Sequence, residues 1–281
     1  YYQNSLKSTF LAHAAVNRAI LELSNDKTQD YDALDDTWAD NKDVFEQIRI
    51  DQGDPGFSSI SYLSKEDDAE KIHYGIIDEE RKINLNTASK ELLETLFEKN
   101  KIDSPQDLAN NILIWRGDVP DTDHSYDTLG YSCKAKKMDR LQELVLINGF
   151  TLDIYQKIKD VCTVYGAGTI NLNTVPEETL YCIGRGLAKK LLLDTESADS
   201  VVTKILELRK QKKFFTNTGE VLITTANAIE DQIFNELKNQ VIFASGYFLI
   251  KATGNVHRIE KTLEIIYNRY DQKIAFWHEK K

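Results

Sequence analysis

The amino-acid sequence predicts an α+β protein in which a sheet-containing domain is interrupted by a helical insertion. Three observations carry this prediction. The chain opens with helical periodicity, strand-like runs follow that helix and return at the end of the chain, and a repeated motif that begins helices lies between them. This order assigns residues 1–85 and 241–281 to one core and residues 86–240 to the insertion.

The first predicted element is a helix that ends near residues 24–26. Its apolar side chains, many of them alanine, recur on one stripe: Leu11, Ala12, Ala15, Val16, Ala19, Ile20 and Leu23. Small side chains let another element approach the helix closely. We expect this stripe to pack on the protein's own sheet, and the helix of another copy is the alternative.

The predicted strands are runs rich in β-branched and aromatic residues. A polar, acidic loop over residues 25–56 precedes them. The runs are Phe57–Leu63, His73–Ile77, Tyr247–Thr253, Val256–Arg269 and Lys273–His278. Gly254 and Asn255 predict a hairpin turn between two of the last runs.

An internal repeat is the most informative feature of the sequence. The hexapeptide Ile83–Ala88 (Ile-Asn-Leu-Asn-Thr-Ala) returns 87 residues later as Ile170–Val175 (Ile-Asn-Leu-Asn-Thr-Val). Each copy is predicted to begin a helix, with Asn86 or Thr87 and then Asn173 or Thr174 as N-caps. Pro176, Glu177 and Glu178 suit a first helical turn.

The segment after the second copy resembles a helix-hairpin-helix unit, with Gly184 and Gly186 placed in the hairpin. In DNA-binding members of that family, hairpin amides hold a phosphate and glycine allows the backbone to approach it. The corresponding segment of the first copy, Phe97–Lys101, lacks glycine. The chain holds 35 Lys and Arg against 45 Asp and Glu, a formal charge of −10 that repels phosphate backbones. We therefore expect a packing unit and no nucleic-acid partner.

An acidic loop is the candidate metal site. Asp118, Asp121, Asp123 and Asp127 place four carboxylates within ten residues. Hard cations such as calcium bind clustered oxygens of this kind. The spacing is not that of an EF-hand, so a solvated acidic loop is the alternative.

The sequence contains no pattern typical of an enzyme. The five histidines are scattered, and no HExxH, GxSxG, phosphate-loop or dinucleotide motif is present. Cys133, Cys162 and Cys182 leave open both free thiols and one disulfide with a leftover thiol. No apolar run of about 18 residues occurs. The chain starts within a helical pattern and without Met, so we expect a preceding segment to be missing.

These features resemble the K-type minor pseudopilins of type II secretion, the general secretion pathway protein K family. The resemblance spans nearly the whole chain. It rests on the alanine-rich opening helix, Asp35–Ala39, Asp78–Ala88, Trp115–Asp118, Leu141–Leu144 ahead of Asn148 and Gly149, Ile170–Thr174 and the strand-rich end. It implies a pilin-like core, a long N-terminal helix packed on an antiparallel sheet. A large all-α insertion with two helix-hairpin-helix-like repeats would interrupt this core.

The resemblance also implies a place and partners. Members sit at the pseudopilus tip with the I- and J-type minor pseudopilins in a heteromeric complex and can bind calcium. The chain would be the periplasmic domain of a bacterial protein anchored in the inner membrane by a missing N-terminal helix. The partner-binding surface expected here is the first helix, through the stripe from Leu11 to Leu23. A helix-hairpin-helix DNA-binding protein of an uptake system and a pilus-associated adhesin tip are the alternatives.

Overall fold

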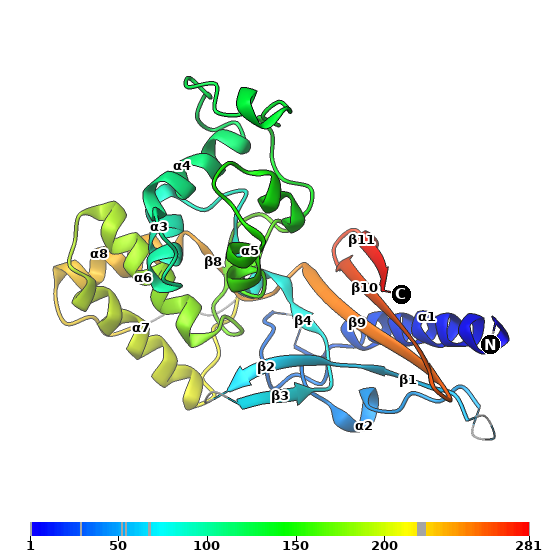
Figure 1. Cartoon of the computed structure of the whole chain (residues 1–281). Coiled ribbons are helices and arrows are strands. Elements are labelled where there is room, and N and C mark those ends of the chain that lie inside the picture. Colours follow the sequence, from blue (N-terminus) through cyan, green and yellow to red (C-terminus); the bar gives the residue numbers. More distant parts are fainter. Residues whose placement is uncertain are drawn as a thin grey trace. The chain divides into compact units, whose positions relative to one another are not determined.

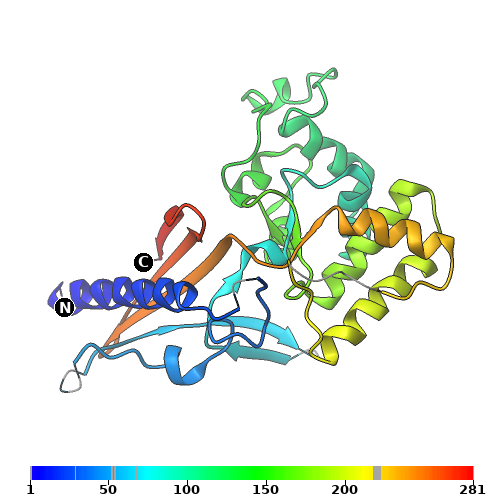
Figure 2. The same cartoon turned by 180° about the vertical axis from the view of Figure 1, so that it is seen from behind.

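The chain folds into two units, and the second is inserted into the first (Figures 1 and 2). The structure is a computed structural model that describes residues 2–28, 30–51, 53, 55–66, 69–217 and 223–280. The first unit comprises residues 1–79 and 243–281, and the second comprises residues 80–242. The predicted insertion, 86–240, lies within the second unit.

The first unit is a long helix packed on an antiparallel sheet. Helix α1 (Tyr2–Ser24) runs along strands β1, β9 and β10. The strand order is β1-β9-β10-β11, and β4 also pairs with β9. The strands are β1 (Phe57–Ile60), β4 (Ile77–Asp78), β9 (Tyr247–Val256), β10 (Ile259–Asn268) and β11 (Lys273–Lys280). Helix α2 (Lys42–Phe45), the hairpin β2 (Tyr62–Glu66) and β3 (Ala69–His73), and the 3₁₀ turn η1 (Glu79–Arg81) complete the path to the insertion.

The core of this unit lies between α1 and the sheet. Side chains of β9 alternate between partly and fully buried, as expected for a strand with one face against a helix. Phe248 and Ile250 are fully buried in the same cluster as Ala12 and Ala15. Trp38 packs edge-on against Phe248, with ring centroids 5.2 Å apart. The predicted helix-on-sheet arrangement is confirmed.

Gly254 is part of strand β9 and not of a turn. The strand continues to Val256, and the hairpin turns at His257, whose φ is +55°, and at Arg258. A Cβ at Gly254 would lie 1.9 Å from the carbonyl oxygen of Ser8 in α1. The predicted turn was wrong because this glycine is required by the close approach of the helix, a contact between distant parts of the sequence.

The second unit is mainly helical. Two pairs of two-residue parallel strands, β5 with β6 and β7 with β8, accompany its helices. The elements are β5 (Ile83–Asn84), α3 (Lys90–Lys99), α4 (Pro105–Trp115), η2 (Asp127–Leu129), η3 (Leu141–Leu146), α5 (Leu152–Ile158), β6 (Cys162–Thr163), β7 (Ile170–Asn171), α6 (Glu177–Leu191), α7 (Thr195–Lys210), α8 (Ala228–Lys238) and β8 (Val241–Ile242). The unit is therefore not purely α-helical.

The sequence repeat is also a structural repeat. Asn86 accepts a hydrogen bond from the backbone N–H of Met138 (2.7 Å) and donates to its carbonyl oxygen (2.9 Å). Asn173 makes the same pair of bonds with Phe215, at 2.9 and 2.8 Å. Both amides are buried, and each holds a distant loop by donating from its nitrogen and accepting at its oxygen.

The structure corrects the predicted N-caps, because the repeated asparagines bond to distant loops and other residues lie at the N-cap positions. Helix α3 is capped by Ser89, whose side chain accepts from the backbone N–H of Leu92. Helix α6 has Pro176 at its N-cap position, without a side-chain cap bond. The repeated asparagines lie before the helices and bind the loops instead.

The predicted glycine hairpin does not exist. Gly184 and Gly186 lie within α6, which is continuous from Glu177 to Leu191. A Cβ on Gly186 would lie 2.9 Å from the Cα of Leu92 in α3, and one on Gly184 would lie 2.9 Å from Val202 Cγ2 in α7. These glycines allow α6 to pack closely against two helices, so they are not available to hold a phosphate.

Candidate interaction surface

The alanine stripe of α1 lies in the core of the first unit. Leu11, Ala12, Ala15, Val16, Ala19 and Leu23 are buried. Ile20 is partly buried and packs against the same cluster. The stripe thus covers the protein's own sheet, as its periodicity predicted. The structure corrects the prediction that these residues form the partner-binding surface, because the sheet already occupies them.

The opposite side of α1 carries a second apolar stripe, and this one is exposed. Tyr2, Leu6 and Phe10 follow at four-residue intervals and are 78%, 45% and 63% exposed. Leu21 is exposed near the helix end. We call Tyr2, Leu6 and Phe10 the outer stripe of α1. Single exposed apolar side chains are ordinary, whereas a row of large ones indicates an interaction surface.

The edge strand β11 extends this surface. Trp277 is 53% exposed, and its ring packs edge-on against His13 of α1 with centroids 5.6 Å apart. Ile274 on the same strand is also exposed. Because β11 ends the sheet order, its outer edge carries backbone groups without a strand partner in the described residues.

The four carboxylates of the acidic loop do not converge. Asp118 Oδ2 lies 2.6 Å from Nη2 of Arg116. Asp121 accepts hydrogen bonds from the backbone N–H and the hydroxyl of Ser125, and the backbone bond is the main cause that lowers its pKa. These two carboxylates are therefore used within the loop.

The remaining two members of the loop are also held apart. Asp123 accepts a long hydrogen bond of 3.4 Å from Thr122, and Asp127 lies 3.8 Å from His124 Nδ1 at the surface. Within the described part of the chain, three carboxylates close enough to share one ion occur elsewhere. The residues of this loop do not fit the predicted calcium site.

The motif around Trp115 has a structural explanation. Arg116 is buried and donates to the carbonyl oxygens of Leu85 (2.7 Å) and Ala88 (2.9 Å), which fixes the first repeat motif. The indole N–H of Trp115 donates to Glu143, in η3. These residues, on which the resemblance to the family partly rests, therefore stabilise the helical unit.

A cleft of about 350 Å³ lies within the helical unit, between α3 and α6. Its wall includes Lys82, Lys190 and Glu236 beside apolar Leu92 and Leu187. Lys190 is paired with Glu236 at 2.9 Å. The charges of this wall are mixed, which does not favour a phosphate backbone.

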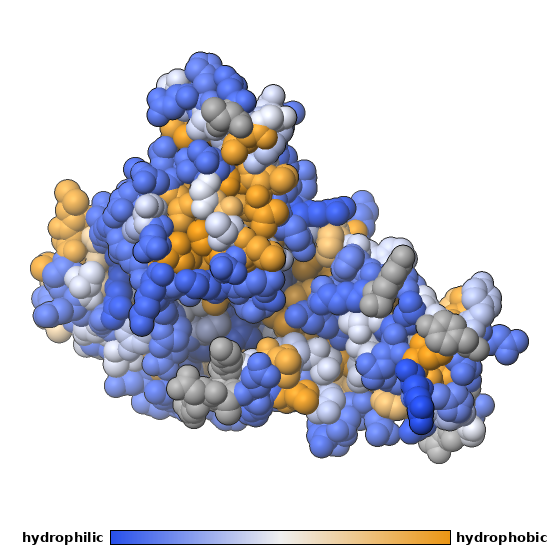
Figure 3. Space-filling model, in the orientation of Figure 1, coloured by the Kyte–Doolittle hydropathy of each residue, from blue (hydrophilic) through white to orange (hydrophobic). Residues whose placement is uncertain are grey.

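The helical unit also exposes apolar side chains. Figure 3 shows hydrophobic residues gathered on the face of the region that contains α4 and α5. In this region η3 and α5 carry the exposed side chains of Val145, Leu146 and Leu152.

The three cysteines are free thiols. Cys162 and Cys182 are buried, and burial raises the pKa of both thiols, that of Cys182 to about 12. Among the described helices, none is both long and apolar enough to cross a membrane.

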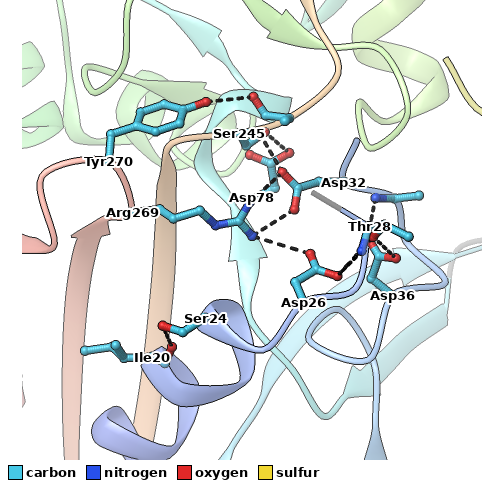
Figure 4. A network of polar contacts seen from close by, with 12 residues as sticks. Ile20, Ser24, Asp26, Thr28, Asp32, Asp36, Asp78, Ser245, Arg269 and Tyr270 are labelled. Atoms are coloured by element: carbon cyan, nitrogen blue, oxygen red, sulfur yellow. Dashed lines mark hydrogen bonds and ion pairs between the residues drawn. The ribbon is translucent and has the colours of Figure 1, made fainter. Parts of the chain in front are cut away.

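The structure assembles one group of carboxylates that the sequence did not single out. Asp26, Asp32 and Asp36 follow α1, and Arg269 from the end of β10 reaches into their group (Figure 4). Their sequence spacing matches no known ligand pattern, and the arginine lies more than 230 residues away. The sequence indicated these residues only through the acidic character of the loop over residues 25–56.

Comparison with solved structures finds a chain of the GspK-GspI-GspJ complex from the type 2 secretion system of enterotoxigenic Escherichia coli. The TM-score is 0.66 over 100% of this chain and 97% of that chain, at 14% sequence identity. No family model and no curated protein matches the sequence. At this identity the likeness shows the fold, so the resemblance to K-type minor pseudopilins and the predicted fold class are confirmed at the level of the fold.

Proposed function

We propose that this chain is the periplasmic part of a K-type minor pseudopilin, a non-enzymatic building block of type II secretion. In this role it occupies the tip of the pseudopilus with I- and J-type minor pseudopilins. The observation that carries the proposal is the extent of the structural likeness, which includes the helix-on-sheet unit and the helical insertion in one chain. The structurally similar chain belongs to the GspK-GspI-GspJ complex.

The outer stripe of α1 supports an assembly role. Its three large apolar side chains face away from the sheet, so a partner helix can cover them without unfolding this protein. Burial of such side chains contributes about 1.5–3 kcal/mol each when it is complete. We infer that partners dock on this stripe, together with Trp277 beside it.

Size-exclusion chromatography with light scattering tests this proposal. We expect the chain to form a heteromer with soluble I- and J-type partners. The variant Phe10→Glu should weaken assembly at least about tenfold, because a carboxylate in an apolar helix contact is costly. Asn17→Glu is the matched control, since Asn17 is an exposed polar residue on the same side of α1.

The outcomes separate the function from the surface. If the wild-type chain elutes alone in the presence of both partners, the proposed function is refuted. If Phe10→Glu assembles as well as Asn17→Glu, the proposed function is still supported, but the outer stripe is not the docking surface. Both variants should remain folded, because both positions face water.

The DNA-binding alternative predicts a different result. The glycines that would grip a phosphate are packed against Leu92 and Val202, and the chain carries ten excess negative charges. We expect no appreciable binding of duplex DNA at physiological salt. A sub-micromolar, salt-sensitive Kd in fluorescence anisotropy would favour the alternative.

A further inference from the structure

Each copy of the repeat motif is held by an arginine, and the arginine of the first copy has an acidic partner. Arg116 donates to the carbonyl oxygens of Leu85 and Ala88. Its Nε also donates to Asp118 Oδ2, at 2.7 Å. The side chain of Arg116 is 4% exposed, so its charge needs a counter-ion close by. In the first copy the fold itself supplies that counter-ion.

Arg209 has the equivalent position in the second copy. Ile205–Arg209 of α7 corresponds in sequence to Ile112–Arg116 of the first copy. Nη1 of Arg209 donates to the carbonyl oxygen of Val175 at 2.7 Å, and this carbonyl is the counterpart of the one at Ala88. Arg209 therefore holds the second motif in the same way.

The arginine of the second copy has no bonded acidic partner. Gln211 stands at the position that corresponds to Asp118. Among the described residues, the bond to Val175 is the only hydrogen bond of Arg209, and no carboxylate lies within ion-pair distance of it. The acid whose charge reaches Arg209 is the exposed Glu177, in the first turn of α6. The fold therefore leaves this partly buried guanidinium without a bonded counter-ion.

A second arginine lies beside Arg209 in the helical unit. Arg81 belongs to η1, and its positive charge is close enough to lower the pKa of Arg209. Burial is the larger cause, and that pKa falls to about 10 although Glu177 raises it. The half-buried side chain of Arg81 makes no hydrogen bond and no ion pair in the described part of the chain. Two neighbouring positive charges of this kind repel each other unless an anion balances them.

A pair of guanidinium groups is suited to a phosphate group. The planar N–H donors of arginine match the oxygens of phosphate and carboxylate, and the group stays charged at neutral pH. A phosphate monoester carries about −1.5 to −2 charges at pH 7, which balances two arginines better than the single charge of a carboxylate. We propose that Arg81 and Arg209 bind the phosphate group of inorganic phosphate or of a phosphate monoester.

The bound phosphate would take the role that Asp118 has in the first copy. Val175 already engages Nη1 of Arg209, so Nε and Nη2 are the donors left for the phosphate, together with the guanidinium of Arg81. Duplex DNA does not suit this site, because its diester phosphates carry one charge each and the chain has a net charge of −10. The inference does not depend on the proposed secretion function.

Calorimetric titration of inorganic phosphate into the chain tests the proposal. Sodium chloride keeps the ionic strength constant, so that general screening does not change during the titration. We expect one ion bound per chain. Arg81→Gln should raise the Kd by about tenfold or more, because it removes a charge-assisted hydrogen bond. Glu177→Gln should lower the Kd, because it removes the nearby negative charge. Arg258→Gln is the matched control, an equal change of charge at an exposed position of the first unit.

A second measurement distinguishes the two sources of phosphate. The chain is sedimented with vesicles of phosphatidylcholine, with and without phosphatidic acid, whose head group is a phosphate monoester. Binding of inorganic phosphate without binding to either vesicle assigns the site to a free anion. Binding to the vesicles with phosphatidic acid, lost in Arg81→Gln, assigns it to a lipid head group. Both results support the proposed site.

The remaining results overturn the proposal. Neither heat with millimolar phosphate nor vesicle binding would show that Arg81 and Arg209 need no phosphate. Equal Kd values for Arg81→Gln and Arg258→Gln would exclude this site, and displacement of phosphate by an equal concentration of acetate would assign it to carboxylates. If circular dichroism shows that Arg81→Gln is unfolded, Arg81→Lys replaces it, since lysine keeps the charge but lacks the planar donors. An unchanged Kd in Arg81→Lys would then refute the proposal.

Discussion

Replacing Gly254 by alanine is expected to destabilise the first unit by about 2 kcal/mol. The new Cβ would lie 1.9 Å from the carbonyl oxygen of Ser8 and 2.8 Å from the backbone nitrogen of Ala12. Ordinary contact begins at 3.4 Å, so α1 would have to recede by about 1.5 Å, the difference between 3.4 and 1.9. Overpacking of this kind costs about 1–3 kcal/mol, and backbone atoms of a helix cannot rotate away as a side chain can.

Part of that cost is offset by the strand itself. Alanine in a strand interior is more favourable than glycine by about 0.5–1 kcal/mol, which reduces a cost of about 3 kcal/mol to about 2 kcal/mol. The loss should come from the first unit, where Ala12 and Ala15 pack on the sheet without exposed area.

Urea denaturation followed by tryptophan fluorescence measures this effect. A Trp115→Phe background leaves Trp38 and Trp277, both in the first unit, as the reporters. A loss of about 2 kcal/mol lowers the midpoint by about 1 M urea. Gly53→Ala is the control, because its nearest neighbour atom would be 3.6 Å from the new Cβ. Equal midpoints for the two variants would refute the close approach of α1.

Two further predictions concern helix packing and protonation. Gly186→Ala should lower stability more than Gly184→Ala in thermal scans, because its Cβ would meet the helix backbone at Leu92, whereas a Cβ at Gly184 would meet a side-chain methyl group of Val202. Equal Tm values for the two variants would contradict this. Burial, despite Arg269, raises the pKa of Asp32 to about 7 from 3.8. The folded state therefore binds the extra proton, so the contribution of Asp32 to stability should be fully present below about pH 4 and fall by at most about 4 kcal/mol as pH rises through 7. Asp32→Asn should flatten this part of the plot of urea midpoint against pH. An unchanged slope would show that Asp32 is not the group responsible for the pH dependence.

Elements that depend on local pattern were predictable from the sequence. The stripe from Leu11 to Leu23 has helical periodicity, and burial of one face of α1 follows from it. The repeat at Ile83 and Ile170 predicted two related units because nearly identical segments favour the same local structure. Their parallel strand pairs and asparagine clamps show this equivalence.

Features that depend on distant contacts were not predictable. Gly254 resembles a turn residue, but the backbone of α1 dictates its identity. Asn86 resembles an N-cap, but its partner Met138 lies 52 residues away. The carboxylates near Asp121 are close together in the sequence and far apart in the structure. Asp26, Asp32 and Asp36, by contrast, are brought together by the tertiary structure. Spacing along the chain therefore does not show which carboxylates lie close together in the structure.

The pairing of β4 with β9 has a consequence for the order of folding. Asp78 lies opposite Phe248, so the chain leaves and re-enters the sheet at adjacent positions that are separated by 170 residues. Closing so long a flexible loop costs about 4 kcal/mol more than closing a two-residue hairpin. An insertion that is already folded shortens that loop, so the helical unit should form first. During synthesis α1 is made before the insertion and β9 to β11 after it, so the alanine face of α1 stays without these strands until the insertion has been made.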